Sequence, residues 1–147
     1  MLKTLTLKEN LQNLLDSILQ TSSNKEFRIS FDCDDKVFLV EPYPLIVYRI
    51  LKELTVNALK HSQGSRLNVT LLQEKGQIEL IVQDNGVGMA ATPCTDGKEH
   101  KGLSSIQEQL VLINGSMKIE SVQPNGLCII VQFPMKGGGS YAYFIGR

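Results

Sequence analysis

The sequence lacks an excess of charge, a membrane-length apolar run and an export signal. Fifteen Lys and Arg residues balance fifteen Asp and Glu residues, so no net field favours nucleic acid or an anionic membrane as a partner. No apolar stretch approaches the ~18 residues of a membrane span, and the first residues do not follow the order of a signal peptide. We therefore expect a soluble, cytoplasmic piece that contacts neither nucleic acid nor membrane directly, although its parent protein could be anchored in the inner or plasma membrane.

Cysteine is also scarce, with only Cys33, Cys94 and Cys128. Their odd number and wide separation fit neither a zinc site nor a disulfide framework, which favours a reducing compartment. The length of 147 residues suits one domain with a substantial core. We place this domain at residues 1–136, with a lead-in helix within 1–22, and leave the Gly-rich tail 137–147 outside the fold as a flexible or artificially appended end.

Hydrophobic periodicity divides the domain into helical and extended stretches. Apolar residues at helical spacing predict three amphipathic helices, and alternating or short apolar runs bounded by turn residues predict strands. This pattern indicates an α+β two-layer sandwich, with about three helices on one face of a mixed, mostly antiparallel sheet. The expected order is helix 5–19, strands 27–33 and 37–40, helix 46–58, strands 67–71 and 78–82, helix 103–113, and strands 117–122 and 127–133.

One polar stripe on the second helix has the chemistry of a phosphate site. Glu53, Asn57 and Lys60 are spaced at i, i+4 and i+7, so they share one side of the helix at the border of its apolar face. Carboxylate and amide oxygens suit Mg²⁺, and an ammonium group neutralises phosphate. Each residue alone would be read as an ordinary solvated side chain. His61 falls within the apolar stripe, where a packing role is expected.

The segment Asp84-Asn85-Gly86 follows the strand 78–82. A carboxylate fixed at a strand end can accept a hydrogen bond from the exocyclic amine of adenine, which guanine does not offer at the corresponding position. Gly86 and Gly88 would let the backbone approach a base or a phosphate closely. The same segment also suits a hairpin turn with Asn85-Gly86 at its corner.

A third polar segment precedes the last helix. Residues 90–101 are small, polar and aperiodic, which predicts a loop. Gly102, Ser104 and Ser105 then open the helix, and the free N–H groups of such a start favour anions. Glycine and serine at this position are also ordinary helix-capping residues.

Taken together, ELTVNALKH (53–61), DNGVGM (84–89) and KGLSSI (101–106) resemble the N box and the two glycine boxes of the GHKL ATPases, in order and in spacing. The chain is most similar to the catalytic ATP-binding domain of a bacterial sensor histidine kinase, which has a Bergerat-type sandwich. This resemblance implies ATP and Mg²⁺ as cofactors. It also implies transfer of the γ-phosphoryl group to a histidine on a separate dimerisation domain, in a two-component pathway with a response regulator.

The resemblance also assigns roles to individual residues of the second helix. Asn57 would be the magnesium ligand, and Glu53 would act near the γ-phosphate as a base or polarising group. Lys60 would contact phosphate, accompanied by His61. Neither His61 nor His100, the only histidines of the chain, stands where a phosphoacceptor is expected.

The glycine boxes receive roles in the same way. Asp84 would hold the adenine amino group, while the flexible wall of the pocket and the nucleotide lid at 89–101 would enclose the ligand. The residues implied to bind ATP here are Asp84, Gly86, Gly88, Met89, Lys101, Gly102 and Leu103.

Three positions depart from the family pattern. His100 replaces the first glycine of the second glycine box, Gln109 stands where an arginine is common, and Gly126 is followed by Leu127 rather than by threonine. These departures predict weak nucleotide binding. They keep open a nucleotide-sensing or degenerate non-catalytic GHKL module, beside an anti-sigma-type serine kinase or an ATPase that hydrolyses with water.

Overall fold

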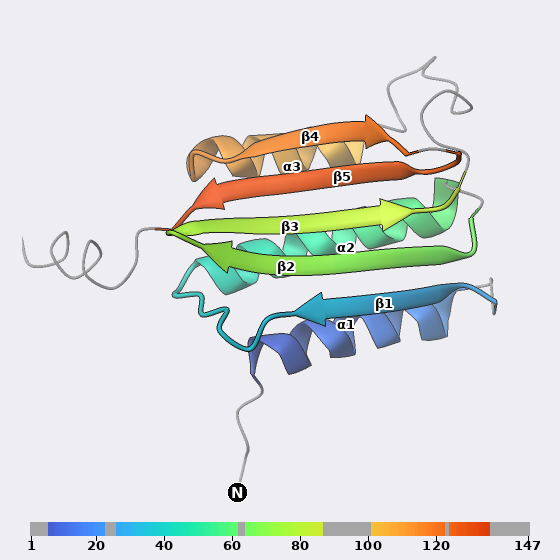
Figure 1. Ribbon diagram of the computed structural model, residues 1–147, viewed down its shortest axis with the longest axis horizontal. Coiled ribbons are helices and arrows are strands. Elements are labelled where there is room, and N and C mark those ends of the chain that lie inside the picture. Colours follow the sequence, from blue (N-terminus) through green and yellow to red (C-terminus); the bar gives the residue numbers. More distant parts are fainter. Residues whose placement is uncertain (1–5, 23–25, 62–63, 87–100, 123, 136–147) are drawn as a thin grey trace, which may run out of the picture.

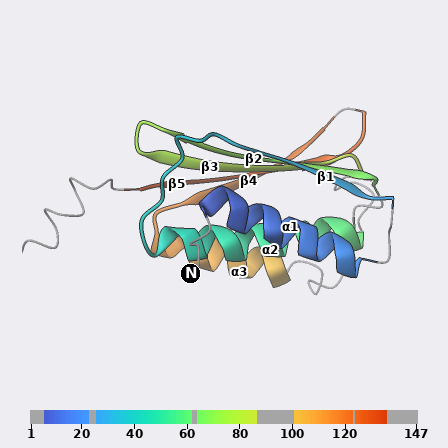
Figure 2. The ribbon, with the colours of Figure 1, turned by 90° about the horizontal axis from the view of Figure 1, so that it is seen from below.

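The computed structural model describes residues 6–22, 26–61, 64–86, 101–122 and 124–135. Three helices lie side by side and cover one face of a five-stranded sheet (Figures 1 and 2). The expected α+β sandwich is therefore confirmed. The elements are α1 (Leu7–Thr21), β1 (Arg28–Cys33), α2 (Tyr43–His61), β2 (Arg66–Glu74), β3 (Gln77–Asp84), α3 (Lys101–Leu112), β4 (Ser116–Ser121) and β5 (Leu127–Pro134).

The sheet is mixed, with the strand order β1-β2-β3-β5-β4. β1 runs parallel to β2, and the other three neighbouring pairs are antiparallel. A parallel pair requires a crossover connection, which α2 provides between β1 and β2. This crossover brings the C-terminal end of α2 to the edge of the sheet where β2 begins and β3 ends (Figure 1).

The core lies between the helices and the inner face of the sheet. Ile78, Leu80 and Val82 are buried in β3 at every second position, and Asp84 continues the same alternation. Because side chains in a strand alternate between faces, Asp84 lies on the same core-facing side of β3 as Ile78, Leu80 and Val82. The ring of Tyr43, the first residue of α2, stacks on that of Phe133, with 5.5 Å between the centroids.

The predicted strand 37–40 is wrong. In the structure this segment carries no strand, and β1 is an edge strand paired only with β2. Phe38 is 68% exposed, and its backbone N–H donates to the side chain of Gln73 (2.6 Å) rather than to a sheet ladder. The short apolar run misled the prediction because residues 37–40 carry the chain from the end of β1 towards α2, instead of folding back as a hairpin.

Local signals explain the ends of the other elements. Thr6 and Glu9 form a reciprocal capping box at the start of α1, which satisfies two of the free N–H groups there. Lys75 and Gly76 connect β2 to β3, and both residues have positive φ, as a tight hairpin requires. Asn114, two residues after the end of α3, also has positive φ, which is typical of the residues that follow a helix.

Some predicted features fall outside the described residues. These are most of the expected lid, including Gly88, Met89 and His100, and the tail 137–147. The lid was expected to extend to residue 101, but Lys101 already belongs to α3. Across the described ranges, no helix has both the length and the apolar character needed to cross a membrane.

Candidate functional site

Asp84 is a buried carboxylate at the C-terminal end of β3. Its residue is 9% exposed, and one carboxylate oxygen accepts a hydrogen bond from the backbone N–H of Gly86 at 2.8 Å. Burial raises the pKa of Asp84, and the backbone hydrogen bonds from Gly86 and Leu127 act in the opposite direction. An ionised carboxylate is costly in such a position, which marks Asp84 as a candidate functional group.

Gly126, the residue just before β5, contributes to this site through a close backbone approach. Asp84 is paired with Leu127 in the sheet, and Gly126 has a φ of +125°. A β-carbon on Gly126 would collide with the carbonyl oxygen of Asp84. Glycine is therefore required at position 126 both for its backbone conformation and for space.

Asn85 forms a side-chain clamp that ties the end of β3 to the start of β2. Its Oδ1 accepts from the backbone N–H groups of Ser65 and Arg66, each at 2.9 Å. Its Nδ2 donates to the Ser65 hydroxyl at 3.1 Å, and its backbone N–H donates to the Arg66 carbonyl at 3.3 Å. We call this set of four hydrogen bonds the Asn85 clamp.

The clamp also explains Gly64. A β-carbon on Gly64 would lie 2.5 Å from Asn85 Oδ1 and 2.8 Å from the Gly86 nitrogen, distances too short for real contacts. The hairpin corner considered for Asn85-Gly86 is wrong, because the next strand along the described part of the chain, β4, pairs with β5 and not with β3. Asn85 instead bonds across to a segment about 20 residues earlier in the chain.

The polar stripe of α2 lies in the last three turns of that helix. Glu53 and Asn57 are half-buried and Lys60 is exposed, as expected for side chains at the border of the core. His61 is the last residue of α2, and its side chain lies outside the described part. α2 ends three positions before Gly64, and its C-terminal end lies at the same end of the sheet as the end of β3, where Asp84 is the last residue (Figure 1).

The N-terminal end of α3 carries three more of the predicted residues. Lys101 and Gly102 are its first two residues, but the Lys101 side chain is not among those described. Leu103 is half-buried and packs against the core. The structure thus places the Asp84 turn and the end of α2 at the same end of the sheet, while Gly88 and Met89 remain predictions from the sequence.

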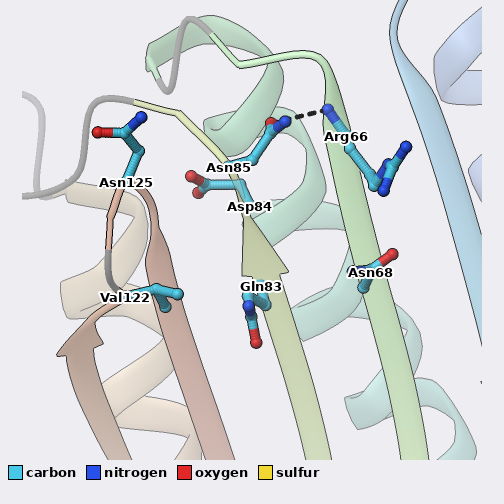
Figure 3. A pocket seen from close by; sticks show the side chains of 7 residues that line it. All are labelled: Arg66, Asn68, Gln83, Asp84, Asn85, Val122 and Asn125. Carbon is cyan, nitrogen blue, oxygen red and sulfur yellow. Dashed lines mark hydrogen bonds between the residues drawn. The ribbon is translucent and has the colours of Figure 1, made fainter.

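A cavity of about 250 Å³ opens beside Asp84 (Figure 3). Carboxamide groups dominate its lining, and they can both donate and accept hydrogen bonds. None of the described residues that line it belongs to α2, so the polar stripe is not part of this cavity. The lining residues are Arg66, Asn68, Gln83, Asp84, Asn85, Val122 and Asn125.

The donor set near α2 suits one cation in particular. The described part of the chain contains no group of three or more His, Cys, Asp or Glu side chains that could enclose a metal. The described residues therefore do not form a zinc or calcium site of that kind. Mg²⁺ differs, because it usually keeps several waters and takes one or two protein oxygens together with substrate phosphates. Asn57 and Glu53 fit that requirement.

Comparison with known proteins places the chain among nucleotide-dependent enzymes. The family described as "Histidine kinase-, DNA gyrase B-, and HSP90-like ATPase" matches residues 43–137. This range runs from the start of α2 to just beyond β5, so it contains the Asn85 clamp, the polar stripe and Asp84.

Individual relatives are similar over most of the chain. The Sensor histidine kinase YdfH of Bacillus subtilis is 34% identical over 61% of this chain. The Sensor protein NarQ homolog of Haemophilus influenzae is 28% identical over 88%. The chain spans only 22% and 23% of these two proteins. The nucleotide-free catalytic domain of histidine kinase ThkA has the same fold, with a TM-score of 0.71, 18% identity and coverage of 91% of this chain and 97% of that one.

Proposed function

The chain belongs to the family of histidine kinase-, DNA gyrase B- and HSP90-like ATPases, and on this premise we propose that it is the ATP-binding catalytic domain of a sensor histidine kinase. Its curated relatives carry the names of sensor histidine kinases, and a solved catalytic domain of that class has the same fold. The proposed reaction is transfer of the γ-phosphoryl group of ATP to a histidine on a separate dimerisation domain.

One observation carries the proposal. Asp84 presents a buried, backbone-held carboxylate at the end of β3, and the Asn85 clamp ties the next residue to Ser65 and Arg66, shortly after the end of α2. A carboxylate accepts hydrogen bonds and cannot donate them when ionised, so it selects the amino group of adenine. The pKa of Asp84 is raised because the carboxylate is buried, and an adenine base bound to it would lie in the same buried environment.

The triphosphate would then extend from Asp84 towards α2. Asn57 would hold Mg²⁺ through its carboxamide oxygen, and the bound cation would neutralise charge on the phosphates. Lys60, exposed near the end of α2, would reach phosphate oxygens as a mobile positive charge. Lys101 and Gly102 would approach the phosphates at the N-terminal end of α3, where free N–H groups favour anions.

Glu53 stands one helical turn before Asn57 and is half-buried. In the proposed transfer, an imidazole nitrogen of the acceptor histidine forms a bond to the γ-phosphorus as the bond to the β–γ bridging oxygen breaks, and ADP leaves. Glu53 would orient that imidazole and take up the proton that its nitrogen releases. Catalysis would otherwise rest on positioning and electrostatic stabilisation.

A nucleotide titration followed by a phosphorylation assay tests this function. The chain should bind ATP with Mg²⁺, and Asn57→Ala should remove the magnesium dependence of binding. Asn13→Ala, on the exposed side of α1, is the matched control and should bind like the wild type. In the full-length parent protein, labelled ATP should yield an acid-labile, alkali-stable phosphohistidine. Absence of adenine-nucleotide binding would refute the proposal.

A second function is favoured by the sequence of the second glycine box, in which His100 replaces a glycine. A domain of this kind could sense nucleotide without transferring phosphate. The same assays separate the two functions, because a sensing module would bind ATP while the parent protein forms no phosphohistidine. An acid-stable phosphoserine on a partner would instead identify a serine kinase.

A further inference from the structure

We propose that Asn85 is a positioning residue for nucleotide binding. Its clamp fixes the segment that follows α2 against the turn that carries Asp84. It thereby sets the separation between the wall that reads the base and the wall that meets the phosphates. This inference rests on the proposed ATP-binding function, because it concerns the geometry of that site.

The clamp begins where the regular sheet ladder ends. The last registered pair of β2 and β3 is Leu67 with Asp84. Beyond this pair, the N–H groups of Ser65 and Arg66 both bond to the single side-chain oxygen of Asn85. The carboxamide therefore acts as an additional acceptor that extends the β2–β3 connection past its last pair.

Both ends of the clamp lead directly to the site. On one side, Gly86 follows Asn85, and its N–H holds the Asp84 carboxylate at 2.8 Å. On the other side, Gly64 precedes Ser65 and lies three positions after His61, the end of α2. A shift of the clamp would therefore move the carboxylate relative to the helix, and small misplacements of binding groups are costly.

Because Asn85 is exposed, a positioning role can be distinguished from a purely stabilising one. The residue is exposed, and its bonds to Ser65 and Arg66 lie at the surface. Hydrogen bonds between groups that water can also satisfy contribute modestly to folding. We therefore expect loss of the clamp to impair nucleotide binding more than it lowers stability.

The decisive experiment compares nucleotide affinity and stability for a small set of variants of the whole chain, with ATP and Mg²⁺ at physiological salt. Asn85→Ala should weaken ATP binding by about tenfold. Asn85→Asp keeps an oxygen acceptor for both N–H groups and should restore affinity to within about threefold of the wild type. Ser65→Ala removes only the bond from Nδ2 and should cause a loss of about twofold.

Thr6→Ala provides the matched control for stability. Thr6 belongs to the capping box of α1, far along the chain from the clamp, and its loss should lower the melting temperature. ATP affinity should nevertheless stay at the wild-type value. This comparison shows whether a general loss of stability is enough to weaken binding.

Gly64→Ala tests the same clamp from the opposite side. The new β-carbon would push against Asn85 Oδ1 and the Gly86 nitrogen, so ATP binding should again fall by about tenfold. This variant also decides the matter if Asn85→Ala does not fold. Wild-type affinity in a folded Asn85→Ala or Gly64→Ala protein, or no rescue by Asn85→Asp, would overturn the positioning role. Absence of ATP binding by the wild type would instead overturn the proposed function.

Discussion

Gly126 approaches the backbone carbonyl of Asp84 so closely that no β-carbon fits between them. The contact joins the start of β5 to the end of β3, at the pair formed by Asp84 and Leu127. The position of the candidate adenine-reading carboxylate therefore depends on two neighbouring strands. The Asn85 clamp fixes it from the β2 side, and Gly126 fixes it from the β5 side.

Substituting Gly126 by alanine should destabilise the protein strongly. The φ of +125° is unfavourable for any residue with a side chain, and the new β-carbon would collide with the Asp84 carbonyl. Together these effects should lower the free energy of unfolding by about 3 kcal/mol. Urea denaturation followed by circular dichroism measures the change.

Gly76→Ala is the matched control for this glycine. Gly76 also has a positive φ, +79°, but the nearest atom to a β-carbon there is 3.7 Å away. Only backbone strain remains, which costs about 1 kcal/mol. If both variants lose the same free energy of unfolding, the close contact between Gly126 and Asp84 adds nothing to the cost of the substitution.

Asp84→Asn should separate binding from stability. The amide oxygen can still accept the bond from Gly86, while the burial cost of the charge disappears. The melting temperature of the nucleotide-free protein should rise, and ATP affinity should fall by about tenfold or more, because a hydrogen bond to a charged group is lost. Calorimetry measures both. Asp32→Asn, on the exposed side of β1, should change neither quantity.

The raised pKa of Asp84 also predicts a pH dependence. Because burial raises this pKa above its ordinary value of 3.8, the native state takes up a proton before the unfolded state does as the pH falls. The contribution of Asp84 to stability therefore increases as the pH drops from the raised pKa towards 3.8. ATP affinity should decrease over the same range, since the protonated group loses its charge. Both steps should be absent from the Asp84→Asn protein.

Thr55→Val should stabilise the protein. Thr55 is fully buried in α2, and its hydroxyl has no hydrogen-bond partner within the part of the chain that the structure describes. Valine has nearly the same shape and removes the unsatisfied group, so the free energy of unfolding should rise by about 1 kcal/mol. Thermal denaturation measures the change. The control Thr6→Val should lower stability by about 1 kcal/mol, because it removes the α1 cap.

Residue periodicity was sufficient to predict the three helices, five strands and the layered arrangement. A local pattern of apolar residues indicates each of these elements, and the turn at Lys75-Gly76 and the turn at Asn114 after α3 follow from local turn chemistry. Residues 37–40 were misread because a short apolar run contains no information about its pairing partner. The parallel pairing of β1 with β2 is a non-local property that only the folded chain reveals.

Prediction of the site has the same limit, because contacts between distant segments cannot be read from a local sequence pattern. Spacing alone placed Glu53, Asn57 and Lys60 on one side of α2, and the position of Asp84 at the end of β3 was also predictable. The role of Asn85 was not, because its partners Ser65 and Arg66 are 20 and 19 residues away, and the same letters describe an ordinary turn. A glycine at 64 followed by a small hydroxyl residue at 65 was the only sequence signal of the clamp.

The Asn85 side chain accepts hydrogen bonds from the main-chain N–H groups of Ser65 and Arg66, and not from the Arg66 side chain. Position 66 can therefore diverge widely among descendants of this gene without disturbing the connection, provided that proline never appears there, since proline has no N–H to offer. The side chain at this surface position can therefore change while the backbone connection between β2 and the end of β3 is kept.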